Sequence, residues 1–199
     1  MIRIGLTGSI GMGKTTTGGL FADAGVPVND ADAAVHELYR GKAAPLVEAA
    51  FPGTVKDGAV DRQALARKLA DDPDAFKRLE AIVHPLVRER EEEFLKRNRE
   101  AGADLVVLDI PLLFESGADA RVDRIVVVTC DPQLQHDRVL ARPGMTEEKF
   151  AMILSRQMPD AEKRKRADYL VDTGHGIEAA RQRVNEIIAD VRRSASKES

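Results

Sequence analysis

The chain has little of several features that mark specialised classes of protein. Its 199 residues include a single cysteine, Cys130, so no disulfide can form within it. No stretch of about 18 apolar residues occurs, and we therefore expect no membrane span. A net charge of −3 and a pI near 5.9 argue against a broad face for binding nucleic acid. These absences favour a cytoplasmic globular protein that binds neither membrane nor nucleic acid.

The sequence also has few residues suited to zinc binding or to thiol chemistry. Cys130 ends an apolar run, where we expect a buried and unreactive thiol. His36 and His84 have no cysteine or histidine neighbour at the spacing of zinc ligands, so zinc is not indicated. The apolar segment at the start of the chain is typical of a core strand, and we expect no cleavable signal peptide.

A complete phosphate-binding loop, Gly-Ser-Ile-Gly-Met-Gly-Lys-Thr, occupies residues 8–15. Its glycines let the backbone fold tightly around a phosphate, and the loop N–H groups converge on the anion at the N-terminus of the next helix. Lys14 supplies a positive charge for the β- and γ-phosphates, and the Thr15 hydroxyl can ligate Mg²⁺. Apolar periodicity predicts a strand over 1–7 and a helix over 15–24, the context that the motif requires. The chain is therefore predicted to bind a nucleoside triphosphate.

Further apolar runs predict the other strands of a parallel sheet. They cover residues 26–29, 105–109, 125–130 and 169–172. The gap of about seventy-five residues between the second and third strands is far longer than an ordinary crossover. Helical patterns fill it, at 31–39, 45–50, 62–70 and 74–98. Two more helices are expected, at 132–142 and at 177–193.

This layout predicts an α/β fold: a P-loop NTPase core with a parallel five-stranded sheet, a helical substrate-binding insertion and a lid. We expect the core at 1–30, 104–142 and 167–193, the insertion at 31–103 and the lid at 143–166. Small-molecule kinases have this arrangement. One insert holds the acceptor, and the other closes over ATP and excludes water.

Carboxylates at two predicted strand ends are candidates for chemistry, because ligands of open α/β sheets bind at that edge. We expect Asp30 to cap the helix that follows it, and Asp32 to face the site. Asp32 could orient an acceptor hydroxyl, take its proton or help to hold Mg²⁺. Asp109 ends the third strand, where P-loop enzymes carry a carboxylate associated with Mg²⁺; a simple turn residue is the alternative. Ile110 follows it instead of Glu, so the acidic pair of P-loop ATPases is missing.

Arginines are the candidate cations for phosphoryl transfer. Arg138 and Arg142 are four residues apart on a predicted helix, so they share one face. There they could offset charge on the phosphoryl oxygens, or they could belong to a solvated amphipathic face. Arg156 is a second candidate in the lid. We expect the basic run at 163–166 to be a solvated edge of the lid.

Several segments together resemble the dephospho-CoA kinase family. They are LTGSIGMGKT at 6–15, DAD at 30–32, HPL at 84–86, IPLLFE at 110–115 and RQM at 156–158. The resemblance runs nearly from end to end. It implies transfer of the ATP γ-phosphate to the ribose 3′-hydroxyl of dephospho-CoA, the last step of coenzyme A synthesis, with ATP and Mg²⁺ as cofactors. It also implies a P-loop core, a helical domain that binds CoA, and a lid.

The resemblance also implies roles for individual residues. The phosphates of ATP would be held by Gly11, Met12, Gly13, Lys14, Thr15 and Thr16. Asp32 would serve the acceptor, and Arg142 would reach ATP from the lid. From the residues themselves we also expect Arg138 at the ATP site and Thr15 and Asp109 at the metal. The expected catalytic residues are Lys14, Asp32 and Arg142.

Two other classes of protein share parts of this pattern. A nucleoside or nucleotide kinase would have the same loop and lid, and only acceptor assays separate it. A regulatory GTPase should carry an Asn-Lys-x-Asp guanine motif, and none occurs in the chain. The expected partner is a small-molecule acceptor, and a monomer is slightly favoured.

Overall fold

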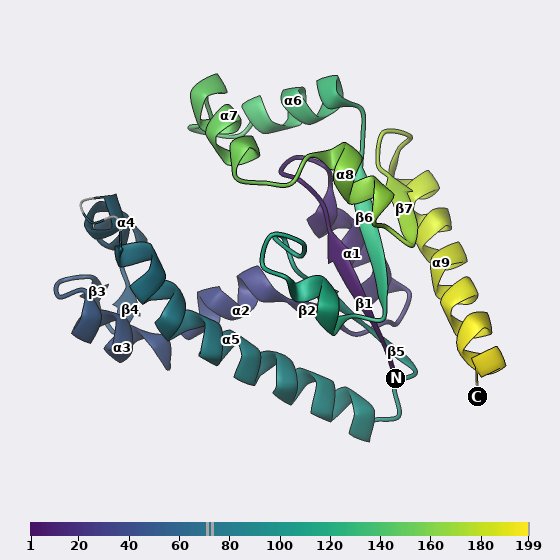
Figure 1. The fold of residues 1–199 in the computed structure, drawn as a ribbon, viewed down its shortest axis with the longest axis horizontal. Coiled ribbons are helices and arrows are strands. Elements are labelled where there is room, and N and C mark those ends of the chain that lie inside the picture. Colours follow the sequence, from purple (N-terminus) through teal and green to yellow (C-terminus); the bar gives the residue numbers. More distant parts are fainter. Residues whose placement is uncertain (71, 73, 199) are drawn as a thin grey trace. The chain divides into compact units, whose positions relative to one another are not determined.

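A computed structural model describes residues 1–70, 72 and 74–198 of the chain. The chain divides into two units, one formed by Met1–Asn29 with Asn98–Ser199 and the other by Asp30–Arg97. In Figure 1 the first unit begins with the purple strand β1 and ends with the yellow helix α9. Each unit has a hydrophobic core of its own.

Five strands form the sheet of the first unit, in the spatial order β2-β5-β1-β6-β7. They are β1 (Ile2–Thr7), β2 (Val28–Asp30), β5 (Leu105–Asp109), β6 (Arg124–Thr129) and β7 (Tyr169–Asp172). Strand β1 pairs in parallel with both β5 and β6, and β6 pairs in parallel with β7. The predicted α/β fold with a parallel five-stranded sheet is confirmed.

Side chains alternate between the two faces of this sheet. Leu6 of β1 and Val126 and Val128 of β6 are fully buried in one core cluster. Val127, which lies between the two valines, belongs to a second cluster with Leu113. Because successive residues of a strand point to opposite faces, the two clusters lie on opposite sides of the sheet.

Helices α1 (Lys14–Asp23) and α9 (Ile177–Glu198) pack against each other and contribute to the first cluster. The second cluster is built from the segment after β5, which includes the short 3₁₀ helix η1 (Ala118–Arg121), and from residues next to α8 (Asp160–Lys165). Helix α9 continues to Glu198, beyond the expected end at 193. Its apolar stripe explains its place on the sheet, because a helix with one apolar face must bury it.

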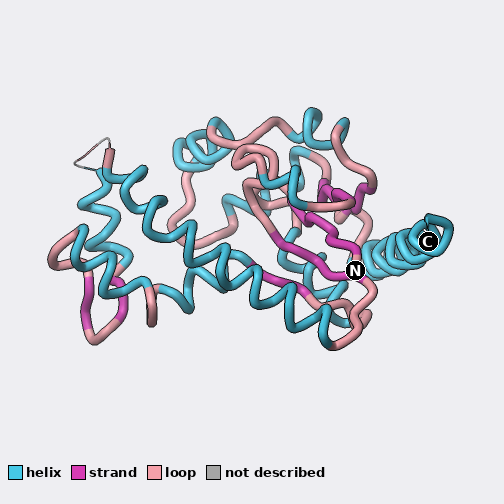
Figure 2. The backbone as a smooth tube through the Cα atoms, turned by 60° about the horizontal axis from the view of Figure 1, so that its bottom comes forward, coloured by secondary structure: helices cyan, strands magenta, loops and turns pink. Residues whose placement is uncertain are grey.

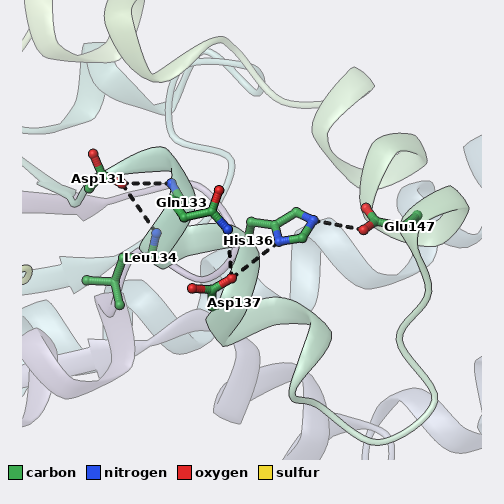
Figure 3. Close-up of polar contacts among 6 residues, drawn as sticks. All are labelled: Asp131, Gln133, Leu134, His136, Asp137 and Glu147. Carbon is green, nitrogen blue, oxygen red and sulfur yellow. Dashed lines mark hydrogen bonds and ion pairs between the residues drawn. The ribbon is translucent and has the colours of Figure 1, made fainter.

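Helices α6 (Pro132–Leu140) and α7 (Glu147–Ser155) follow β6. The Asp131 carboxylate caps α6 by accepting from the N–H groups of Gln133 and Leu134 (Figure 3). The Thr146 hydroxyl caps α7 in the same way. The expectation that the first of these helices extends to 142 is wrong, because it ends at Leu140 and Arg142 lies in the turn beyond it.

The second unit contains four helices and a short antiparallel hairpin among its described residues. They are α2 (Ala31–Leu38), α3 (Ala43–Ala50), β3 (Val55–Lys56), β4 (Ala59–Val60), α4 (Arg62–Ala70) and α5 (Ala75–Glu100), which ends in the first unit. The two strands are magenta in Figure 2. The hairpin was not among the expected elements, although Asp57 and Gly58, with φ of 52° and 76°, form the Asp-Gly turn typical of such loops. Helix α5 runs through Pro85.

Candidate active site

The phosphate-binding loop connects β1 to α1, and three glycines shape it. Gly11 and Gly13 have φ of 81° and 93°, a backbone conformation that other L-residues rarely adopt. Gly13 is also the N-cap residue of α1. Because glycine has no side chain, the N-cap residue does not occupy the N–H groups of the first turn. These groups and the helix dipole suit an anion. A Cβ on Gly8 would lie 2.8 Å from the Val128 carbonyl oxygen of β6, which explains the glycine there.

Lys14 and Asp109, predicted from separate parts of the sequence, lie together. The Lys14 ammonium forms an ion pair with Asp109 Oδ1. Both side chains are largely buried, with 13% and 4% of their surfaces exposed. Strand pairing explains the contact, because Asp109 is opposite Leu6 at the point where β1 turns into the loop.

A cavity of about 370 Å³ opens beside the loop, within the first unit. Gly11, Gly13, Thr16, Arg138 and Arg142, five of the residues expected at the ATP site, line it. It also has a wall that the sequence analysis missed, formed by the turn after β7 and the start of α9: Thr173, Gly176, Ile177 and Ala180. The position of this turn after a parallel strand is the signal that could have revealed it, since ligands bind outside such strand ends.

The two arginines of the cavity differ in their surroundings. Arg138 on α6 donates from Nη1 to Thr173 Oγ1 (2.8 Å) and from Nη2 to the Thr173 carbonyl oxygen (3.0 Å). The Thr173 hydroxyl in turn donates to the Met12 carbonyl oxygen of the loop (2.8 Å). Arg142 is exposed in the turn after α6. Arg138 therefore supports the loop through Thr173, whereas Arg142 lies in the turn that follows the helix.

Comparison with known proteins shows the family of the chain. The sequence model of the family described as dephospho-CoA kinase matches residues 2–178. The chain belongs to the dephospho-CoA kinase family. The family expected from the sequence motifs is thus confirmed, and the enzyme is an ATP-dependent kinase.

Individual relatives agree with this assignment. A dephospho-CoA kinase from Rhizobium etli is 68% identical over 197 residues, which cover 99% of this chain and 97% of the relative. The solved structure of TT1252 from Thermus thermophilus is similar with a TM-score of 0.83 and 38% identity, over 95% of this chain and 96% of that one. Dephospho-CoA kinase from Campylobacter jejuni, at 24% identity and a TM-score of 0.73 over 97% and 98% of the two chains, shares the fold.

In the second unit of the enzyme, Asp30 and Asp32 lie at the start of α2. Asp30 Oδ1 accepts a hydrogen bond of 3.0 Å from the Ala33 N–H, so the expected helix cap is confirmed. Asp32 is exposed in the first helical turn, where a negative charge is favoured by the helix dipole. Its expected role, to orient the acceptor hydroxyl or to take its proton, stays a prediction.

The basic run at 163–166 was expected to form a solvated edge of the lid, and this is wrong for Lys163. Its side chain is fully buried, and its Nζ lies 3.0 Å from Glu115 Oε1. The same oxygen accepts from the Met158 N–H at 2.6 Å. Burial acts to raise the pKa of the Glu115 carboxyl, but the Met158 N–H and the Lys163 charge outweigh it and hold the pKa below its usual value. Arg166 lies over the Phe114 ring, 5.6 Å from its centroid.

A pair of side chains, His136 and Glu147, joins α6 to α7 (Figure 3). His136 Nε2 lies 2.8 Å from Glu147 Oε1, and its Nδ1 lies 3.5 Å from Asp137 Oδ1. Hydrogen bonding to Glu147, and then to Asp137, raises the pKa of the His136 imidazole. The helices on either side of the turn that carries Arg142 are therefore linked by a titratable pair.

The remaining predicted features concern cysteine, metals and membranes. Cys130 is buried, and burial raises the pKa of its thiol, as expected for an unreactive cysteine. Among the described residues, no cluster of three or more histidine, cysteine or acidic side chains could hold a metal ion. Thr15 and Asp109 offer oxygen donors only, a set that fits Mg²⁺, which takes few protein ligands beside phosphates and water. No helix in the described part of the chain has the length and apolar character needed to cross a membrane.

Proposed function

We propose that the chain makes coenzyme A by transferring the γ-phosphate of ATP to the ribose 3′-hydroxyl of dephospho-CoA. The match to the family over residues 2–178 carries this conclusion. The loop, its ion pair and the adjoining cavity support it, because together they offer the N–H groups and cations that a triphosphate requires.

Residues Gly11 to Thr16 would hold the phosphates of ATP. Their N–H groups bind the anion at the start of α1, and the Lys14 ammonium neutralises charge on the β- and γ-phosphates. Thr15 and Asp109 would hold Mg²⁺, which supplies positive charge to the same phosphates. The burial of Lys14 strengthens its effect, since charges interact more strongly where water is excluded.

The transferred group needs further cations and a positioned nucleophile. Arg142 would approach the phosphates from the exposed turn after α6 and stabilise the charge of the transition state, with Arg138 holding the wall of the cavity behind it. Asp32 would orient the 3′-hydroxyl or accept its proton. The insertion at 31–103 would bind the acceptor and the segment at 143–166 would act as the lid. A monomeric state and a cytoplasmic location stay predictions.

An acceptor panel tests the proposal. Purified protein is incubated with ATP, Mg²⁺ and dephospho-CoA, a nucleoside or a nucleoside monophosphate, and ADP release is followed. We expect ADP release with dephospho-CoA, dependent on Mg²⁺, and a product that elutes with coenzyme A on chromatography. Turnover of a nucleoside monophosphate without turnover of dephospho-CoA would overturn the assignment.

A further inference from the structure

One residue of the phosphate-binding loop is held by two glutamines from outside the loop. Gln157 Oε1 accepts a hydrogen bond of 3.1 Å from the Ile10 N–H, and Gln135 Nε2 donates one of 2.7 Å to the Ile10 carbonyl oxygen. Because a backbone N–H only donates and a carbonyl only accepts, these contacts determine which end of each amide faces the loop. Gln135 belongs to α6 and is buried, whereas Gln157 follows α7.

The turn itself leaves these two backbone groups to outside partners. A hydrogen bond of 3.2 Å from the Met12 N–H to the Ser9 carbonyl closes the turn around Ile10 and Gly11. Such a bond satisfies the first and last residues of a four-residue turn, and the N–H and C=O of the second residue point away from it. Gly11, the third residue, has φ of 81°, as type II turns require.

The Ile10 carbonyl and the Gly11 N–H belong to the same peptide plane. In a trans peptide these two groups point in opposite directions, so the group that fixes the carbonyl also aims the N–H. Glycine has no Cβ to oppose rotation of this peptide, and without an outside contact the plane could turn over. The Gln135 amide therefore determines where the Gly11 N–H points.

We propose that Gln135 and Gln157 are positioning residues of the kinase: they hold Ile10 so that the Gly11 N–H is aimed at the ATP phosphates. The inference rests on the proposed role of Gly11 in binding ATP. Because Gln157 lies in the proposed lid segment, the same contact ties the C-terminal part of that segment to the loop. Gln135 provides the second tie from α6, next to Arg138.

Matched Gln→Glu substitutions test the proposal. Gln157→Glu keeps an oxygen acceptor for the Ile10 N–H, whereas Gln135→Glu places a carboxylate against the Ile10 carbonyl oxygen. Both variants add the same negative charge beside the same residue, so repulsion of the nucleotide is common to both. We expect the Kd for ADP and the KM for ATP to rise about 10- to 100-fold more for Gln135→Glu than for Gln157→Glu, the effect of an unmade buried hydrogen bond.

A pH series separates positioning from general damage to the fold. In Gln135→Glu, a protonated carboxyl at position 135 could donate to the Ile10 carbonyl. ADP binding by this variant, relative to wild type, should therefore recover as the pH falls from about 8 to about 6. Gln157→Glu should show no such recovery. If Gln135→Glu does not fold, Gln135→Met removes the donor without charge and should weaken ADP binding about 10-fold.

The outcomes distinguish this inference from the proposed function. Equal losses for the two glutamate variants, or ADP binding by Gln135→Met equal to wild type, would overturn the positioning role. ADP binding requires no acceptor. A wild-type protein that fails to phosphorylate dephospho-CoA would therefore refute the proposed reaction, while a difference in ADP binding between the variants would still support the role of the glutamines.

Discussion

Removal of the Lys163 charge should destabilise the first unit strongly. Lys163 is fully buried, and its ion pair with Glu115 joins α8 to the segment after β5. Lys163→Met fills a similar volume with an apolar side chain, but it leaves the Glu115 carboxylate without its cation. That carboxylate has only 17% of its side-chain surface exposed, so water replaces the lost partner poorly.

The magnitude follows from the cost of stranding a buried charge. Removing one partner of a buried ion pair costs about 3–5 kcal/mol. Glu115 keeps the hydrogen bond from the Met158 N–H, so the lower end, about 3 kcal/mol, applies. For a chain of this length each kcal/mol lowers the Tm by about 2–4 °C. We therefore expect Lys163→Met to lower the Tm by about 6–12 °C.

The same helix provides a matched control. Lys165 Nζ lies 2.7 Å from Glu162 Oε1, but 70% of the Lys165 side-chain surface is exposed. Lys165→Met should change stability by less than about 0.5 kcal/mol, because exposed ion pairs contribute little. Thermal and urea denaturation followed by circular dichroism would measure both variants, and adding Glu115→Gln to Lys163→Met should restore part of the loss. Equal Tm values for Lys163→Met and Lys165→Met would refute the reasoning.

Three further predictions concern the site. Asp32→Asn should lower kcat by about 10²-fold or more while ATP binding survives, measured by steady-state kinetics and calorimetry; a kcat near wild type would exclude an essential charge. Arg142→Ala should lower kcat and kcat/KM together by about 30- to 1,000-fold, with poor rescue by Arg142→Lys, and an unchanged kcat would contradict its role. NMR titration should give His136 a pKa above about 6.5, and Glu147→Gln should lower it. Because the pKa is raised in the fold, the pair stabilises α6 against α7 below about pH 6.5, and this contribution is lost as the pH rises through the raised pKa; equal His136 pKa values in the two proteins would contradict it.

Local patterns were sufficient for most elements of the fold. The apolar runs at 105–109 and 169–172 and the helical pattern at 62–70 have the same bounds in the structure. The bounds depend on side-chain periodicity and on flanking turn residues, which neighbouring positions encode. The phosphate-binding loop was equally clear, because its chemistry depends on the spacing of a few adjacent residues. The Asp57-Gly58 turn is a further local signal, and it encodes the hairpin of β3 and β4.

The tertiary structure decided how distant segments support that loop. Gln135 and Gln157 contact Ile10 across 125 and 147 positions of sequence, and Thr173 reaches Met12 across 161. Lys163 is likewise buried in an ion pair with Glu115. The sequence shows it only as one member of a basic run, and such a run does not reveal which of its side chains is buried. The parallel strand order β5-β1-β6-β7 brings together the segments that follow β1, β6 and β7, which carry Ile10, Gln135 and Thr173. A sequence pattern encodes which residues could bind phosphate, and the packing of the sheet and its helices determines which other side chains hold them in place.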